Sequence, residues 1–165
     1  TRERNSRRGD ARGDAANVGL RGGGGGAGAR HRAAGAGRLE ECRQWGGGPT
    51  GEARITGGYD LPAAHVIHTV GPVWRGGDNG EAVMLASCYR QSLTLAEAAG
   101  CDSIAFPAIS TGVYGYPPEA AARVAMAEVL AWAERHDRPG RIVMCCFSEA
   151  SAEAHRRALK ERRDV

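Results

Sequence analysis

Apolar and polar residues change their spacing several times after residue 52, as expected for strands that alternate with helices. Short apolar runs predict four strands, the last two of them buried, at residues 53–59, 65–70, 103–109 and 141–147. Because strands and helices alternate, we expect a parallel or mixed sheet with helices on both of its faces.

Three stretches have the period of helices. The first begins at Asp78, with Glu81 as its partner in a capping box, and Gly100 ends it. Its predicted apolar face consists of Val83, Leu85, Cys88, Tyr89, Leu93 and Ala96. Pro117 and Pro118 open the second helix, which runs to about residue 136. Ser148 caps the third, which runs to about residue 163.

The first 38 residues have a different composition. They contain eleven glycines, and Val18 and Leu20 are their only large apolar residues. Nine arginines against three acids give this segment a net charge of +6, whereas the remaining residues carry −3. This composition predicts a solvated arm without a buried strand. The domain is nevertheless expected to begin within this segment: we divide the chain into a basic, Gly/Arg-rich arm at residues 1–16 and one domain at residues 17–165.

Composition narrows the class of protein. A chain of 165 residues suits a single domain, and its net charge of +3 is no nucleic-acid footprint by itself. The five cysteines are odd in number and have no Cys-x-x-Cys spacing, which favours free thiols in a reducing cytoplasm over disulfides or a metal site. No apolar run is long enough to span a membrane.

Residues 107–117 carry the clearest chemical signal. Ser110, Thr111, Gly112 and Tyr114 lie between a predicted strand and a predicted helix. Backbone N–H groups in such a turn bind phosphate well, while an aromatic ring covers a sugar. The glycine run at residues 22–26 would let backbone approach a ligand closely, although a linker is the default interpretation of such a run.

The order and spacing of several motifs resemble the macrodomain family, specifically its MacroD-type branch. The motifs lie at residues 22–25, 31–35, 39–42, 49–53, 55–59, 61–63, 66–72 and 105–117. The resemblance implies a three-layer α/β/α sandwich around a mixed, largely parallel sheet, in which the first strands of the family are missing or altered. Family members bind ADP-ribose, and many hydrolyse it from proteins or deacetylate O-acetyl-ADP-ribose, without a metal or cofactor.

The resemblance also assigns roles to individual residues. Backbone N–H groups of Gly112, Val113 and Tyr114 would hold the diphosphate, and the Tyr114 ring would lie over the distal ribose. Asn17 would orient the attacking water, and Phe147 would pack on the adenine, although a phenylalanine at such a position is more often part of a core. The remaining substrate-binding residues would be Gly23, Gly24, Gly25, Ala27, Ser110 and Thr111.

Some positions depart from the family pattern. Many MacroD-type enzymes have an aspartate, often assigned to water activation, where this chain has Ala27. Asp14 replaces the first asparagine of the family motif, and charged residues such as Arg12 occupy the region of an early central strand. His68 lies in an apolar strand pattern and is expected to be a core histidine, whereas we expect His31 to support the glycine loop.

Three functions remain open from the sequence. The first is an ADP-ribosylhydrolase or O-acetyl-ADP-ribose deacetylase, acting as a monomer on ADP-ribosylated protein or the small ester. The second is a non-catalytic reader of ADP-ribose, which Ala27 favours. The third is nucleic-acid binding by the basic arm, which would weaken steeply with salt.

Overall fold

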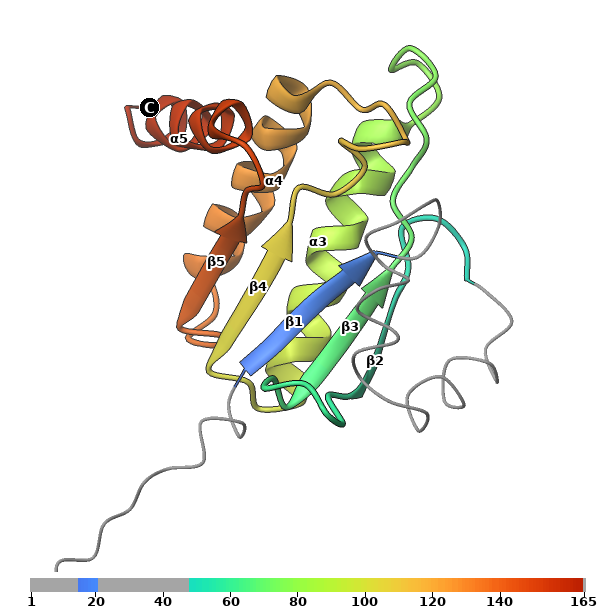
Figure 1. Cartoon of the computed structure of the whole chain (residues 1–165). Coiled ribbons are helices and arrows are strands. Elements are labelled where there is room, and N and C mark those ends of the chain that lie inside the picture. Colours follow the sequence, from blue (N-terminus) through green and yellow to red (C-terminus); the bar gives the residue numbers. More distant parts are fainter. Residues whose placement is uncertain (1–14, 21–47, 165) are drawn as a thin grey trace, which may run out of the picture.

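A mixed five-stranded sheet lies at the centre of the computed structural model, which describes residues 15–20 and 48–164 (Figure 1). Its strands are β1 (Ala15–Leu20), β2 (Ala53–Gly57), β3 (His65–Thr69), β4 (Ser103–Pro107) and β5 (Arg141–Cys145), in the spatial order β2-β3-β1-β4-β5. Only β2 runs antiparallel to its neighbour. The predicted mixed, largely parallel sheet is confirmed.

Strand β1 corrects the prediction that the first 38 residues hold no strand. It pairs in parallel with β3 on one side and with β4 on the other, with Asn17 opposite Val66 and Ala105. The average composition of 38 residues concealed a local run of small and apolar residues at positions 15–20. Strand formation there depends on two neighbours that supply backbone partners, which propensity alone does not register. Arg12 and Asp14 lie outside the described residues.

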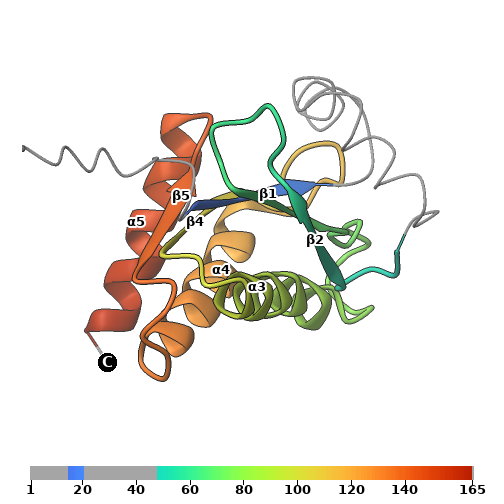
Figure 2. The same ribbon diagram turned by 90° about the horizontal axis from the view of Figure 1, so that it is seen from below.

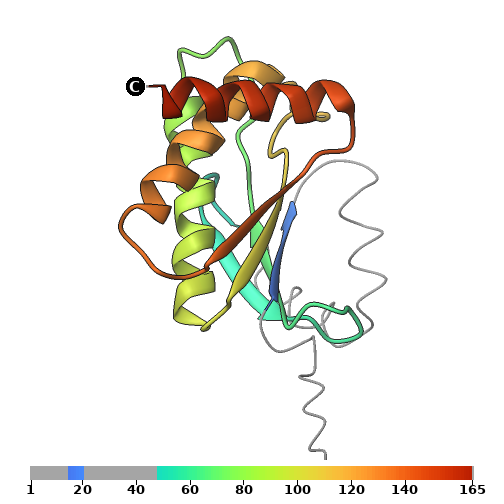
Figure 3. The same ribbon diagram turned by 90° about the vertical axis from the view of Figure 1, so that its left-hand side faces the viewer.

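Three helices follow the strands: α3 (Glu81–Ala98), α4 (Pro118–Ala133) and α5 (Glu149–Arg163). Helices α3 and α4 lie on the same face of the sheet (Figure 2), and α5 crosses α4 beside the β5 end of the sheet (Figure 3). The predicted boundaries at Pro118 and Ser148 are confirmed, since the Ser148 hydroxyl accepts a 3.1 Å hydrogen bond from the Ser151 N–H. Gly100, at φ 71°, ends α3 as predicted.

The core fills the space between the sheet and helices α3 and α4. Tyr89 of α3 packs on Phe106 of β4 with ring centroids 4.9 Å apart. The predicted apolar face of α3 is confirmed at Leu85, Cys88, Tyr89, Leu93 and Ala96, which are all buried. Val83 is a wrong prediction, because its side chain is 73% exposed. It precedes Leu85 by two residues, and this spacing turns it to the opposite side of the helix.

Two other predictions about burial have different outcomes. Strand β5 is an edge strand that pairs only with β4, so the prediction of a buried strand there is wrong. Its two end residues, Arg141 and Cys145, are exposed. The prediction of a core histidine is confirmed, because His68 is 3% exposed and its Nε2 atom lies 3.0 Å from the Thr56 hydroxyl.

The start of helix α3 differs from the predicted capping box. Asp78 is not the cap residue; Gly80 precedes the helix and makes no side-chain cap. The buried Glu81 carboxylate instead accepts backbone N–H hydrogen bonds from Arg75 at 2.9 Å, Gly77 at 3.2 Å and Asn79 at 2.7 Å. Burial alone would raise the pKa of Glu81, but the backbone N–H groups that hold the anion lower this pKa to about 2.

We predict that Glu81 makes the stability of the fold depend on pH in the acidic range. Because the pKa of Glu81 in the folded state is lower than its ordinary value of 4.5, the ionised form stabilises the fold above that pH, and this stabilisation disappears as the pH falls toward 2. Glu81→Gln should therefore lower the urea midpoint at pH 7 but have little effect near pH 2. Urea titrations across this range measure the difference.

The matched control is Glu97→Gln on the same helix, where the carboxylate is 38% exposed and contacts His136 at the surface. An ion pair this exposed contributes little to stability, so its urea midpoint should follow that of the unmodified chain. An equal pH dependence of Glu81→Gln and the unmodified chain would contradict the role assigned to the Glu81 anion.

Candidate functional site

Loops that follow the parallel strands gather at one edge of the sheet (Figure 1). Strands β3, β1, β4 and β5 run in the same direction, so their carboxyl ends share that edge. In open α/β sheets, ligands bind outside the carboxyl ends of the strands. The described loops at this edge are residues 70–80 after β3, 108–117 after β4 and 146–148 after β5.

The loop after β4 is held by hydrogen bonds within itself. The Thr111 hydroxyl donates to the Ala108 carbonyl at 2.9 Å, and the Gly115 N–H donates to the Gly112 carbonyl at 2.9 Å. The Tyr116 N–H donates to the Ser110 carbonyl at 3.0 Å. These bonds close the base of the loop and leave residues 112–114 at its tip.

The tip of this loop presents backbone donors. Within the described residues, the N–H groups of Gly112, Val113 and Tyr114 make no hydrogen bond. Gly112 is exposed, and a Cβ atom added there would meet nothing within 4 Å. Val113 is 76% exposed. Three successive amides without a hydrogen-bond partner in the described part of the chain can receive an anion such as a phosphate.

Ser110 precedes the tip in the same loop and, unlike Gly112 and Val113, is buried. It adopts a left-handed backbone conformation at φ 64°. Its hydroxyl forms no hydrogen bond with the described part of the chain. A Cβ atom at Gly71 would lie only 2.2 Å from that oxygen, so the close approach of the loop after β3 to this loop favours glycine there. A direct role of Ser110 or Thr111 in substrate binding stays a prediction.

The loop after β3 contacts the loop after β4 through Trp74. The Trp74 N–H donates to the Tyr114 carbonyl at 2.8 Å. The indole packs against the Tyr116 ring with centroids 4.6 Å apart. Burial, followed by the nearby negative charge of Glu81, raises the pKa of Tyr116, so its hydroxyl stays neutral at ordinary pH. Sequence reasoning missed Trp74; the available signal was its position two residues before the Gly76-Gly77 pair, which precedes an acidic helix start.

Phe147 lies at the same edge, directly after β5. Its side chain is 79% exposed, so it is not part of the core. Strands β4 and β5 are neighbours in the sheet, which places Phe147 and the 112–114 tip on the ends of adjacent strands. The preceding Cys146 has its Sγ atom 3.6 Å from Nδ1 of His155.

The remaining predicted site residues lie in or near the first quarter. The backbone of Asn17 lies in the central strand β1, three positions before its last residue Leu20. It is paired with Ala105, which lies two positions before the end of β4. Gly23, Gly24, Gly25 and Ala27, together with His31 and Cys42, lie outside the described residues. The structure thus brings together residues 110–114 and Phe147 at one edge, and β1 leads toward that edge.

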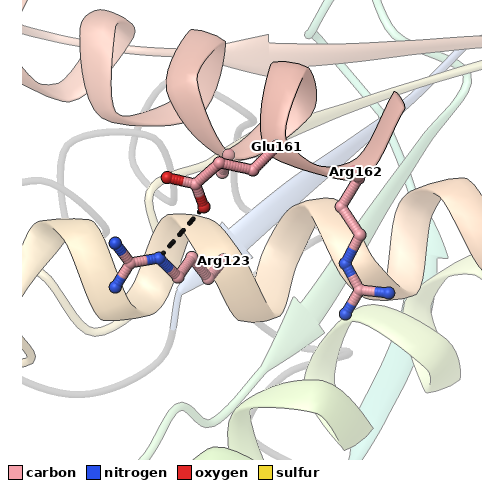
Figure 4. Close-up of a pocket in the computed structure, with 4 residues that line it drawn as sticks. Arg123, Glu161 and Arg162 are labelled. Atoms are coloured by element: carbon pink, nitrogen blue, oxygen red, sulfur yellow. Dashed lines mark hydrogen bonds and ion pairs between the residues drawn. The ribbon is translucent and has the colours of Figure 1, made fainter. Parts of the chain in front are cut away.

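A separate surface hollow of about 350 Å³ lies between α4 and α5 (Figure 4). Arg123, Ala158, Glu161 and Arg162 line it, and Arg123 pairs with Glu161 at 3.3 Å. Both partners of this pair are more than half exposed. None of the lining residues comes from the loops that follow the parallel strands, so the hollow is distinct from the loop edge.

Two further observations concern metals and membranes. Within residues 15–20 and 48–164, no group of three or more His, Cys, Asp or Glu side chains is arranged to hold a metal ion. The helices described there also include none with the length and apolarity needed to cross a bilayer.

Of the cysteines described, Cys88 and Cys101 are buried free thiols as expected, whereas Cys145 is exposed.

Comparison with known proteins identifies relatives over nearly the whole chain. A family model for the Macro domain matches residues 14–125. Macro domain-containing protein CT2219 from Chlorobaculum tepidum is 55% identical over 150 residues, covering 91% of this chain and 87% of that protein. An O-acetyl-ADP-ribose deacetylase from Klebsiella pneumoniae is 53% identical over 150 residues, covering 88% and 86%.

Comparison of structures finds the same family. The solved structure of the Oceanobacillus iheyensis macrodomain with ADP matches this one with a TM-score of 0.81 at 37% identity, covering 94% of this chain and 89% of that one. These matches confirm the predicted α/β/α fold class and the family resemblance drawn from the motifs. By sequence and by structure, the chain belongs to the macro domain family.

Proposed function

We propose that this protein binds ADP-ribose at the loop edge and hydrolyses ADP-ribose esters, either on proteins or as O-acetyl-ADP-ribose. The observation that carries the proposal is the set of three N–H groups at Gly112, Val113 and Tyr114 that have no hydrogen-bond partner within the described residues. A diphosphate offers several anionic oxygens, and successive backbone amides bind it without a lysine or a metal. The ADP named for the Oceanobacillus iheyensis macrodomain contains the same group.

The two ends of ADP-ribose fit the neighbouring features. The exposed Phe147 ring, on the strand beside β4, suits the flat face of adenine. The Tyr114 ring, half-buried and fixed through its own carbonyl, suits the distal ribose. The glycines at residues 23–25 are proposed to cover the other side of the diphosphate, and Ala27 to line the same side.

Hydrolysis adds one water and breaks the ester bond, which releases ADP-ribose and a carboxylate. We assign the orientation of this water to Asn17, because the central strand β1 leads to the loop edge and an amide side chain can hold a water by hydrogen bonding. The relative named O-acetyl-ADP-ribose deacetylase supports this class of reaction. We also infer that the protein acts as a monomer in the cytoplasm.

A second candidate function is that of a non-catalytic reader, which binds ADP-ribose without turnover. The observation that favours it is Ala27, because a methyl group cannot activate water as the aspartate of many MacroD-type enzymes is assigned to do. Both functions use the same binding loop, and a measurement of turnover separates them.

Binding is tested by calorimetry with ADP-ribose. We expect the unmodified chain to bind, and Gly112→Glu to weaken binding by about a hundredfold or more, because like charges brought together cost several kcal/mol. Gly112→Ala is the matched control: its Cβ atom has open space, so folding and most of the affinity should remain. Absence of binding by the unmodified chain would remove both candidate functions.

Turnover is tested with O-acetyl-ADP-ribose and with a mono-ADP-ribosylated protein. Asn17→Ala should lower kcat by about a hundredfold, the cost of a misplaced reactant, and change the affinity for ADP-ribose much less. The control is Asn5→Ala, in the predicted arm. If the unmodified chain binds but releases no product, the reader function replaces the hydrolase, and an unchanged kcat in Asn17→Ala would refute the role of that residue.

A further inference from the structure

We propose that Glu81, acting through Trp74, is a positioning residue that holds the 112–114 tip in its ligand-binding conformation. This inference rests on the proposed function, because it gives the β3–α3 loop a part in binding the diphosphate. No contact between Glu81 and ligand is implied. A chain of short contacts links the buried Glu81 anion to the exposed loop.

The first step is the anchoring of residues 75–79 by the Glu81 carboxylate. One oxygen, Oε1, accepts the N–H groups of Arg75 and Gly77, and the other, Oε2, accepts that of Asn79. Residues 75–80 are otherwise exposed and lie in no helix or strand. Hydrogen bonds to a charged acceptor are stronger than neutral ones, so the anion gives this short loop one preferred shape.

The second step links this loop to Trp74. Arg75, which donates to Glu81, is the next residue in the chain, so its anchored N–H restrains the peptide group that follows Trp74. Gly77 packs directly on the indole, where an added Cβ atom would lie 2.8 Å from Cη2. The indole therefore contacts both Gly77 and the Tyr116 ring.

The third step links Trp74 to the tip. The Trp74 N–H donates to the Tyr114 carbonyl, while the Tyr116 N–H reaches back to Ser110. The peptide groups of residues 112–114 lie between these two restraints. Since the tip makes no other backbone hydrogen bonds through its own N–H groups within the described residues, its orientation depends on the restraints at its ends.

Charge repulsion and loop positioning predict opposite changes in the affinity for ADP-ribose when the Glu81 charge is removed. The direction of the measured change therefore tests the inference. A carboxylate near an anionic ligand repels it, so the removal of the Glu81 charge would strengthen binding if repulsion were dominant. Because backbone donors already hold this anion, we expect the loss of order to outweigh the loss of charge. Glu81→Gln should then weaken binding of ADP-ribose.

The experiment measures two quantities on the full chain at pH 7. Calorimetry gives the Kd for ADP-ribose, and NMR amide exchange gives the protection of Trp74, Gly115 and Tyr116, whose N–H groups close the contacts described above. In Glu81→Gln, we expect faster exchange at all three amides. If only about a tenth of the molecules keep the loop in its binding-competent conformation, the apparent Kd rises about tenfold.

Two variants keep the test decisive. Glu97→Gln, the matched control on α3, should leave both quantities unchanged. Trp74→Ala keeps the hydrogen bonds of Glu81 but removes the indole, and it should raise the Kd and loosen Gly115 and Tyr116 while Asn79 stays protected. This second variant also serves if Glu81→Gln does not fold.

The outcomes separate this inference from the proposed function. Unchanged exchange at Gly115 and Tyr116 in both variants, or tighter binding by Glu81→Gln, would overturn the positioning role. If the unmodified chain does not bind ADP-ribose, the proposed function fails, while the exchange data still show whether Glu81 orders the loop. A general loss of protection in β4 and α4 would identify a merely structural effect and also overturn the inference.

Discussion

Strand β1 is the link on which the rest of the sheet depends. In the order β2-β3-β1-β4-β5, the pairs β2–β3 and β4–β5 are joined only through it. Without its hydrogen bonds to β3 and β4, the sheet would separate into two-stranded pieces, which are marginally stable in water. Its parallel pairing also turns the carboxyl ends of β3, β1 and β4 to one edge, where the loops of the candidate site meet.

The protein uses the same donor chemistry twice at this edge. Inside the loop after β3, backbone N–H groups are occupied by the Glu81 carboxylate. At the tip of the loop after β4, the N–H groups of residues 112–114 have no hydrogen-bond partner among residues 15–20 and 48–164. Ordering a loop upon binding would reduce affinity, so an internal anion that fixes one loop can prepare its neighbour for an external anion. Trp74 provides the contact between them.

Local sequence patterns predicted the elements between residue 53 and the last helix well. Pro118, Ser148 and Gly100 end or begin helices through their own covalent geometry or side-chain chemistry, and this requires no tertiary partner. Val83 and strand β5 were misjudged because the interior is defined by what packs against a residue. Val83 turns away from the sheet, and β5 has a neighbour on only one side.

Within the candidate site, too, one feature could be proposed from the sequence and another could be seen only in the structure. Residues 107–117 could be proposed from the sequence as a phosphate-binding loop because hydroxyls, glycines and tyrosines between a strand and a helix form a local pattern. The role of Glu81 could not, since a capping box and a buried loop anchor have the same acidic residue at a helix start. Only the folded backbone shows that three N–H groups converge on its carboxylate.

Residues 15–20 show most clearly where sequence information ends. Short-range patterns determined the family resemblance, several helix limits and the position of the loop after β4, because each depends on residues close together in the chain. Tertiary structure decided that a weakly apolar run becomes the central strand, because its backbone partners in β3 and β4 begin 49 and 88 residues farther along the chain at His65 and Ser103. Pairing over such distances is a property of the assembled sheet, and no local propensity encodes it.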